Sequence, residues 1–284
     1  MNPKARVIRV ESMADASHAN HHLVVETAAG TELDLVLRRY TDAERLEEDR
    51  WYAPRDEVGA LRTLEPLELP VPRLIAADVE PAVCDVPALL VTWMPGSPSG
   101  TPEDLERFVT RLAEPLPAIH GADPRTGSRA YEPYFVSDGR TVADLRPPAW
   151  SRDAAMWERA LEAIMADPPD GPMRFIHRDY HHHNTVWEHD ELTGIIDWTA
   201  GCVGPPGIDL ARMRLNLLDF DLETADRFLD AWRAVSGADN SYHPYWDLLD
   251  AADMLYDDPP ANADEAIRDA RYEEFVRRAL PSLA

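Results

Sequence analysis

The sequence predicts an α+β fold with a β-rich N-terminal lobe and a mainly helical C-terminal lobe. Two early segments, "ARVIRVES" and "HHLVVETAAGTELDLVLRRY", alternate apolar and polar residues with the period of β-strands. After the Pro/Gly/Ser-rich stretch that follows "VPALLVTW", apolar residues recur at helical spacing instead. We therefore expect one lobe over residues 1–94 and a second over residues 95–284.

The elements of the first lobe follow from local patterns. Ala28, Ala29 and Gly30 form the expected tip of a hairpin between two strands. A helix is predicted within residues 50–69, because Val58, Leu61 and Leu64 repeat at helical spacing. The chain then returns to an extended form and reaches a buried strand in "VPALLVT".

The second lobe is predicted to begin with a capped helix. Thr101 is the expected N-cap, with Pro102 at the first helical position and Asp104 completing a capping box. A further helix is expected within residues 151–167, and the C-terminal part also has helical spacing.

Composition limits the possible partners and location. The chain of 284 residues has 52 acidic and 28 basic residues, a formal net charge of −24. Such a charge repels polyphosphate backbones, so we expect no nucleic-acid partner. The two cysteines are far apart and no apolar run reaches the length of a membrane span. We expect a cytoplasmic protein without a membrane segment or an obligate protein partner.

The stretch "FIHRDYHHHNTVW" at residues 175–187 has two interpretations. His177 and His181 are four positions apart, as in the H-E-x-x-H motif of zinc enzymes. However, Arg178 occupies the place of the glutamate, and "MRFIHRD" has the pattern of a strand that enters a turn. The three consecutive histidines, residues 181–183, could not all face one ion. A metallohydrolase is therefore disfavoured.

The same residues also fit a phosphoryl-transfer loop. Asp179 and Asn184 have the spacing of the kinase motif H-x-D-x-x-x-x-N. In that motif the aspartate orients a hydroxyl and accepts its proton, while the asparagine reaches a metal ion. His177 would be a buried support of the loop. Asp197, at the end of the apolar "GIID", is either a Mg²⁺ ligand or a turn former. Asp209 is expected to cap the following helix.

Taken together, "HRDYHHHN…IIDW…GPPGIDLA" resembles the motifs of the aminoglycoside phosphotransferase (APH) and choline kinase-like family. The resemblance extends through the first lobe and covers most of the chain. It implies a bilobal protein-kinase-like fold that uses ATP and Mg²⁺. It also implies that Asp179 is the catalytic base and that Asn184 and Asp197 hold the metal ion.

The first lobe should then bind the phosphates through a cation supported by a carboxylate. Strand alternation places Arg38 on the same face as Val36, where the family usually has a lysine. Arg39 is the nearest alternative for this role. Glu57 matches the family's helix glutamate that supports the cation, and the alternative is a solvated helix charge.

The remaining nucleotide contacts are implied by the same resemblance. "LLVTWMPG" resembles the hinge of the family, in which the backbone of Thr92, Trp93 and Met94 would bind adenine. The phosphate-covering loop should lie in "ESMADASHANHH", which contains no glycine. Ser17 and Asn20 are its candidate phosphate contacts.

A small-molecule acceptor is expected, because Asp209 follows Asp197 by only 12 positions and leaves no room for a peptide-binding activation segment. Acidic and aromatic residues near the C-terminus could bind an amine-bearing sugar or another natural product. The candidates are Tyr245, Trp246, Asp247 and Asp250. The alternative for this segment is an amphipathic helix with a solvated acidic face.

These observations predict an ATP-dependent phosphotransferase that moves the γ-phosphoryl group to a hydroxyl of a small molecule. The acceptor would be an antibiotic or a related natural product, such as an aminoglycoside or a nucleoside, and the role could be antibiotic resistance. The alternative is a non-catalytic pseudokinase that binds ATP or a metabolite. Arg38 and the glycine-free loop leave this alternative open.

Overall fold

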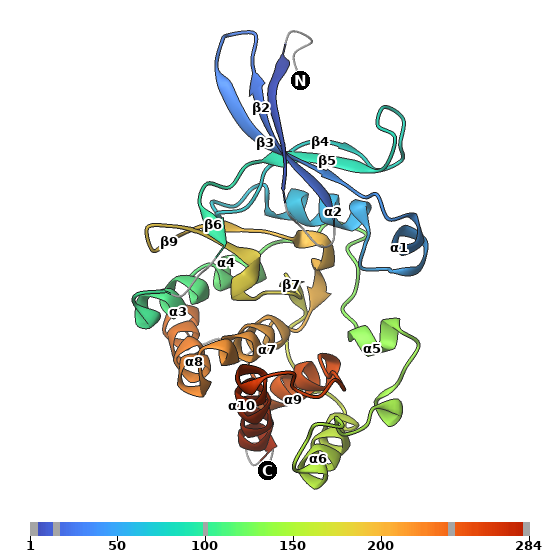
Figure 1. The fold of residues 1–284 in the computed structure, drawn as a ribbon, viewed down its shortest axis with the longest axis vertical. Coiled ribbons are helices and arrows are strands. Elements are labelled where there is room, and N and C mark those ends of the chain that lie inside the picture. Colours follow the sequence, from blue (N-terminus) through green and yellow to red (C-terminus); the bar gives the residue numbers. More distant parts are fainter. Residues whose placement is uncertain (1–4, 14–17, 99–101, 238–241, 281–284) are drawn as a thin grey trace. The chain divides into compact units, whose positions relative to one another are not determined.

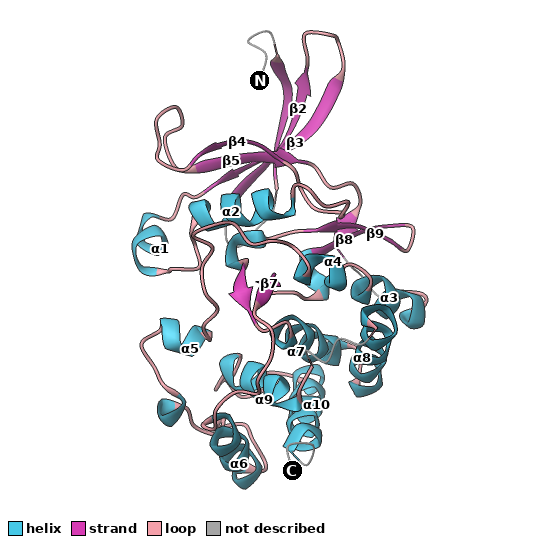
Figure 2. Cartoon of the chain, turned by 180° about the vertical axis from the view of Figure 1, so that it is seen from behind, coloured by secondary structure: helices cyan, strands magenta, loops and turns pink. Residues whose placement is uncertain are grey.

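The computed structural model describes residues 5–13, 18–98, 102–237 and 242–280. The chain forms two compact units, each built from three segments. The first comprises Met1–Ser99, Ala122–Arg129 and Asn184–Gly201; the second comprises Gly100–Gly121, Ala130–His183 and Cys202–Ala284. Most strands belong to the first unit and most helices to the second (Figures 1 and 2), as the α+β prediction requires.

A five-stranded antiparallel sheet dominates the first unit (Figure 1). Its order is β1-β2-β3-β5-β4. The strands are β1 (Arg6–Ser12), β2 (Ala19–Glu26), β3 (Glu32–Arg39), β4 (Leu74–Asp78) and β5 (Ala88–Thr92). The predicted hairpin tip is confirmed: β2 and β3 are joined through Gly30, whose φ of 78° favours glycine.

The register of β3 gives its two faces different roles. Leu35 packs with Leu23, Val25 and Leu90 in a hydrophobic core. Arg38 stands directly opposite Asn20 of β2, so both side chains belong to one face of the sheet. The predicted alternation along β3 is therefore confirmed.

The helices and the second sheet of the first unit complete its architecture. They are α1 (Ala43–Glu48), α2 (Pro54–Leu64), η3 (Trp198–Ala200), and the strands β6 (Ser97–Pro98), β8 (Thr185–Glu188) and β9 (Glu191–Ile195) in the order β6-β8-β9. The turn that joins β8 to β9 consists of His189 and Asp190, both with positive φ. Strand β9 begins directly after this turn, at Glu191.

The second unit is mainly helical (Figure 2). Its helices are α3 (Leu105–Ala113), α4 (Leu116–His120), α5 (Tyr134–Ser137), η1 (Val142–Asp144), α6 (Ala154–Ile164), α7 (Gly207–Asn216), η4 (Leu217–Asp219), α8 (Leu222–Ser236), α9 (Pro244–Asp253) and α10 (Ala263–Ala279). A two-stranded sheet pairs β7 (Arg174–Ile176) with β10 (Cys202–Gly204). The turn η2 (His182–Asn184) carries the chain from the second unit to the first.

The start of α3 differs from the prediction. Asp104 is its N-cap, and its side chain accepts a hydrogen bond from the Arg107 N–H at 3.1 Å. Pro102 precedes the helix, and Thr101 lies outside the described residues. Aspartate is among the strongest N-cap residues, which explains why the helix begins after Asp104.

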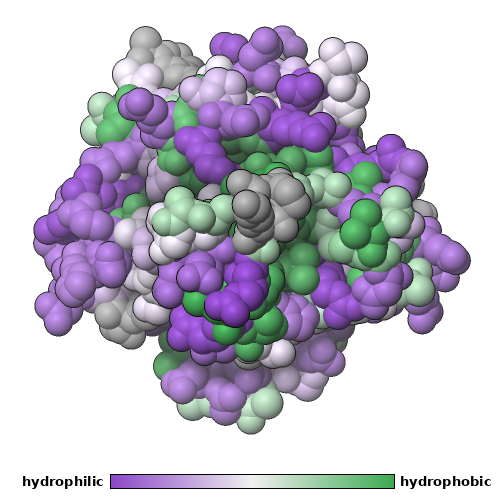
Figure 3. Space-filling model, turned by 90° about the horizontal axis from the view of Figure 1, so that it is seen from above, coloured by the Kyte–Doolittle hydropathy of each residue, from purple (hydrophilic) through white to green (hydrophobic). Residues whose placement is uncertain are grey.

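One face of the molecule is largely hydrophilic (Figure 3). Figure 3 shows one face on which hydrophilic side chains predominate and hydrophobic ones form small groups. Within the described ranges, no helix combines the length and the apolar character needed to cross a membrane.

Candidate active site

Arg38 joins two carboxylates in the first unit. Its Nε lies 3.3 Å from Glu57 Oε1 of α2, and its Nη2 lies 3.0 Å from Asp197 Oδ1. The Tyr40 hydroxyl donates a hydrogen bond to Glu57. Glu57 is only 2% exposed, so the alternative of a solvated helix charge is wrong.

The charge state of this cluster follows from its neighbours. Burial by itself would lower the pKa of Arg38, but the carboxylates of Glu57 and Asp197 raise it above its ordinary value. The guanidinium therefore stays charged, as a buried cation paired with two anions should. Arg39 is partly exposed and pairs with Asp85.

A cavity of about 150 Å³ in the first unit brings the predicted nucleotide residues together. It has an apolar part that includes Val36, Val91 and Ile196. The predicted residues in its lining are Asn20, Arg38, Glu57, Thr92, Trp93, Met94 and Asp197. Ser17, the other predicted phosphate contact, lies outside the described residues.

Two backbone groups of the predicted hinge already have partners. The Thr92 N–H donates to the Arg73 carbonyl at 3.0 Å, and the Trp93 N–H donates to the Asp34 carbonyl at 3.1 Å. Both N–H groups are therefore already used in hydrogen bonds to neighbouring backbone carbonyls. A base in the cavity would have to use other backbone groups of this stretch.

The two predicted metal ligands are linked through the backbone. The Ile196 N–H donates to the Asn184 carbonyl at 2.9 Å, which places residue 184 beside the residue that precedes Asp197. Asp197 has a φ of 63° and its side chain is 31% exposed. A carboxylate and an amide supply the oxygen ligands that Mg²⁺ prefers, so this pair fits the ion.

In the second unit, Asp209 anchors the loop that contains Asp179. The fully buried Asp209 accepts hydrogen bonds from the N–H groups of His177, at 3.0 Å, and Arg178, at 2.7 Å. His120 Nε2 lies 3.0 Å from the same carboxylate. Asp209 is in the first turn of α7 and is not its N-cap, so the capping prediction is wrong. These bonds hold Arg178 at a φ of 70°, a conformation that costs about 1–3 kcal/mol for a non-glycine residue.

Asp179 lies beside a histidine and an arginine. Its Oδ2 is 3.3 Å from His181 Nε2, and its Oδ1 is 3.7 Å from Arg212 Nη1. Burial would raise the pKa of Asp179, but His181, Arg212 and His177 together hold it well below its ordinary value. The carboxylate is ionised and its side chain is 28% exposed, so it can accept a hydrogen bond from a ligand.

The acidic residues of α9 have partners inside the protein. Asp250 Oδ1 lies 2.8 Å from Arg212 Nη2, and Asp247 pairs with Arg214. Asp247 is 2% exposed and Asp250 is 1% exposed. The alternative of a solvated acidic face on this helix is therefore wrong.

The predicted aromatic residues have different surroundings. Tyr245 and Trp246 line a cavity of about 540 Å³, within the range of small-molecule sites. Most of the lining is apolar, and Arg140 is its charged residue. Asp247 and Asp250 do not line it.

Sequence reasoning missed two residues near Asp179. Arg212 pairs with Asp179, and the Tyr134 ring packs against the Arg178 guanidinium at 3.2 Å from the ring centroid. Arg212 had a signal, because an arginine in the apolar "IDLARMRL" needs a buried partner. The sequence around Tyr134 has no periodicity, so no comparable signal exists.

Comparisons with known proteins agree with this architecture. The sequence model of the phosphotransferase enzyme family (APH) matches residues 14–250. A homoserine kinase of Rhodospirillum rubrum is 30% identical over 165 residues, which cover 54% of this chain and 50% of that protein. The match thus spans about half the length of this relative.

Solved structures share the fold at low sequence identity. Macrolide 2'-phosphotransferase MphH of Brachybacterium faecium has a TM-score of 0.59 at 20% identity, with 89% of this chain and 84% of that chain covered. Amicoumacin kinase hAmiN, solved with AMP-PNP, Ca²⁺ and its ligand, has a TM-score of 0.62 at 13% identity, with coverage of 95% and 88%. A thermostable mutant of aminoglycoside phosphotransferase APH(4)-Ia, solved with ADP and hygromycin B, has a TM-score of 0.62 at 16% identity, with coverage of 95% and 94%.

Proposed function

The chain belongs to the phosphotransferase enzyme family (APH), and from this premise we propose that it transfers the γ-phosphoryl group of ATP to a hydroxyl of a small molecule. The observation that carries the proposal is the cluster of Arg38, Glu57 and Asp197 in the lining of the first-unit cavity. A kinase needs this combination of a supported cation and a metal-binding carboxylate.

Each predicted residue has a chemical task in this proposal. ATP with Mg²⁺ supplies the phosphoryl group, and Asn184 and Asp197 hold the metal ion. Arg38 binds the phosphates, and Glu57 keeps its guanidinium oriented. Asp179 orients the acceptor hydroxyl and accepts its proton. Because the pKa of Asp179 is lowered, its carboxylate is ionised and free of a proton of its own.

The cavity in the first unit suits part of a nucleotide. Its volume of about 150 Å³ is below the roughly 300–1,000 Å³ of sites that enclose a whole ligand. We therefore assign the base to the apolar part of the lining and leave the phosphates outside the enclosed volume. Since the N–H groups of Thr92 and Trp93 have partners, we assign the backbone contact with the base to Met94 and to the carbonyls of this stretch.

The acceptor is proposed to have an apolar body. The cavity of the second unit is lined mainly by apolar side chains, and the carboxylates of α9 are paired with arginines. A polycationic aminoglycoside would find few carboxylates to bind there. Residues Pro133 and Phe135 of the lining flank Tyr134, whose ring packs on the guanidinium of Arg178, the residue before Asp179. This proximity supports the use of the cavity by the acceptor.

ADP release in the presence of ATP and Mg²⁺ tests the proposal. The acceptors are a macrolide, amicoumacin, hygromycin B and homoserine, chosen from the relatives, with a nucleoside antibiotic and choline added. Asp179→Asn should lower turnover by about 10²–10⁴-fold, the range of general-base catalysis, while ATP affinity and thermal stability stay near wild type. Asp190→Asn is the matched control, because Asp190 is exposed at a hairpin turn.

The outcomes separate the two functions that the sequence allows. A hit that Asp179→Asn removes and Asp190→Asn retains would support the phosphotransferase. ATP binding without ADP release on any acceptor would favour a non-catalytic nucleotide-binding protein. Equal turnover in both variants would refute the role of Asp179.

A further inference from the structure

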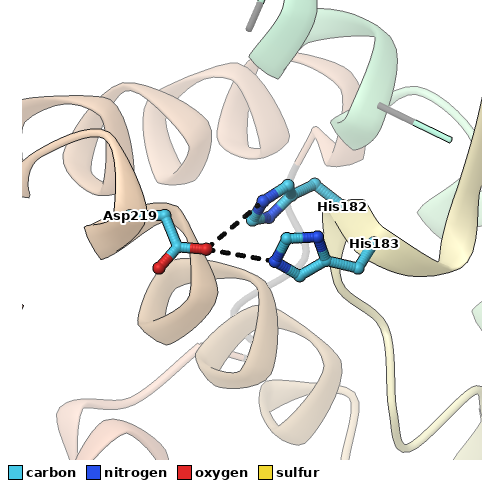
Figure 4. A group of neighbouring side chains, drawn as sticks. All are labelled: His182, His183 and Asp219. Carbon is cyan, nitrogen blue, oxygen red and sulfur yellow. Dashed lines mark hydrogen bonds and ion pairs between the residues drawn. The ribbon is translucent and has the colours of Figure 1, made fainter. Parts of the chain in front are cut away.

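Two histidines of the turn after Asp179 converge on one carboxylate of the second unit. His183 Nε2 lies 3.1 Å from Asp219 Oδ2, and His182 Nε2 lies 3.6 Å from the same oxygen. Figure 4 shows both rings directed at Asp219, which belongs to η4 between α7 and α8. The two rings are 3.9 Å apart between centroids.

The geometry refines what the sequence suggested about the three consecutive histidines. The three side chains do not all face one point, which agrees with the expectation from the sequence. His181 turns toward Asp179, whereas His182 and His183 turn together toward Asp219. The turn therefore separates one histidine beside the proposed catalytic base from a pair of histidines at another carboxylate.

An ordinary ion pair accounts for only part of this arrangement. Only the exposed His183 lies at hydrogen-bond distance from the carboxylate oxygen. The second imidazole, from the 2% exposed His182, is directed at the same oxygen from inside the protein. Two imidazoles and a carboxylate are a common ligand set of zinc.

The distances suit a tetrahedral ion. The three donor atoms all lie within 4.8 Å of one another. Bonds of about 2.0–2.2 Å in a tetrahedron separate the ligand atoms by about 3.3–3.6 Å. The two nitrogen–oxygen distances, 3.1 and 3.6 Å, lie close to this range. The two nitrogens, which lie within 4.8 Å of each other, would take a similar separation around a bound ion.

We propose that His182, His183 and Asp219 form a binding site for a divalent transition-metal ion of the zinc type. Each neutral imidazole would bind through Nε2, with its proton on Nδ1, and Asp219 would bind through its ionised carboxylate. The fourth position would be taken by water, because the side chains of His183 and Asp219 are 56% and 42% exposed. Mg²⁺ is not the expected ion, since it prefers oxygen ligands.

The position of the site suggests its consequence. A bound ion would connect the turn after Asp179 to the segment between α7 and α8. Arg271 already fixes this segment by donating to the carbonyls of Leu218 and Asp219. The ion would therefore restrain the turn against a fixed support. The site does not depend on the proposed phosphotransferase activity.

Equilibrium dialysis with Zn²⁺ on the full chain, without an affinity tag and after chelator treatment, tests the proposal. Wild type should bind one zinc ion per chain at this site in the presence of a large excess of Mg²⁺. His183→Asn and Asp219→Asn should each weaken the binding by at least about tenfold, because each removes a ligand. His189→Asn is the matched control, since His189 is exposed at the β8–β9 turn.

Two further measurements distinguish this site from adventitious zinc binding by surface side chains. Zinc should raise the melting temperature of wild type and His189→Asn but not of His183→Asn, whose stability without metal should equal that of wild type. Bound Co²⁺ should give the intense visible absorption of tetrahedral coordination. Equal zinc binding by wild type and His183→Asn, or no zinc binding by wild type, would overturn the proposal.

Discussion

The two units each contain an arginine that joins a buried carboxylate to an accessible aspartate. In the first unit, Arg38 joins Glu57 to Asp197, whose side chain is 31% exposed. In the second unit, Arg212 joins Asp250 to Asp179, whose side chain is 28% exposed. In each cluster, a buried arginine–carboxylate pair thus also contacts a second carboxylate, an aspartate that solvent can reach.

The clusters differ in how the arginine holds that aspartate. Arg38 donates a hydrogen bond to Asp197 at 3.0 Å, whereas Arg212 lies 3.7 Å from Asp179, beyond hydrogen-bond distance. The Arg38 cluster also lines a cavity, while Asp250 is buried outside the lining of the second-unit cavity. Substitution of Arg38 is therefore expected to affect both ligand binding and the stability of the fold. Substitution of Asp250 is expected to affect mainly the stability.

The largest effect is expected from Arg38→Ala. The substitution leaves Glu57 buried without its cation, which typically costs about 3–5 kcal/mol of unfolding free energy. It should also weaken ATP binding, because the phosphates lose their cation. Arg38→Lys should recover much of both, since it keeps the charge but not the guanidinium geometry. Denaturant unfolding and nucleotide titration measure the two effects.

Arg39→Ala is the matched control for this prediction. Arg39 is the next residue of β3, and its ion pair with Asp85 is exposed. Exposed pairs contribute about 0–1 kcal/mol, so the control should stay close to wild type in both measurements. Equal losses in the two variants would contradict the role assigned to Arg38.

A smaller effect, on stability alone, is expected from Asp250→Asn. Burial raises the pKa of Asp250 to about 7, although Arg212 opposes this shift. Between its ordinary pKa of 3.8 and about 7, the folded state therefore binds more protons than the unfolded state. This contribution to stability is complete below pH 3.8 and is lost as the pH rises through about 7. Asp250→Asn should remove this pH-dependent loss of stability. The free energy of unfolding of both proteins at pH 5 and pH 8 measures the difference.

The same variant separates a structural role from the substrate role that the sequence suggested. If Asp250 supports the fold, the Asn variant should keep the wild-type KM for the acceptor at a temperature where it is folded. A raised acceptor KM with unchanged stability would restore the substrate role. The exposed Asp190→Asn variant again provides the control.

These clusters also show which features of the site could be predicted from the sequence. The position of Arg38 followed from strand alternation, and the motif spacing singled out Asp179 and Asn184, since both signals are local. The partner of Asp247 could not be predicted, because Arg214 lies 33 positions away and the two meet only when α7 and α9 pack. The anchoring role of Asp209 was missed for the same reason, since its donors lie 31 and 32 positions earlier.

The fold shows the same limit. Alternating strands and amphipathic helices were predictable, because the period of each can be recognised within a short stretch of sequence. The discontinuous units were not, because Asn184–Gly201 joins the first unit although Asn184 lies 85 positions after Ser99. The exact start of a helix was also not predictable, because more than one nearby residue can act as its N-cap. In α3 the N-cap is Asp104, three positions after the predicted Thr101.

The smallest effect is expected from Val136→Asp, which tests the apolar cavity of the second unit. Val136 lines this cavity and is 41% exposed, so the carboxylate can reach water and the fold should lose little stability. An apolar acceptor that contacts it would lose about 1–2 kcal/mol, or roughly tenfold in KM. Val235→Asp is the matched control, because Val235 of α8 is 40% exposed and lies outside the lining. If both variants leave the acceptor KM unchanged while Asp179→Asn abolishes turnover, the acceptor does not use this cavity. In that case the second unit would resemble the first only in its charged cluster, and the acceptor site would have to be sought among other residues near Asp179.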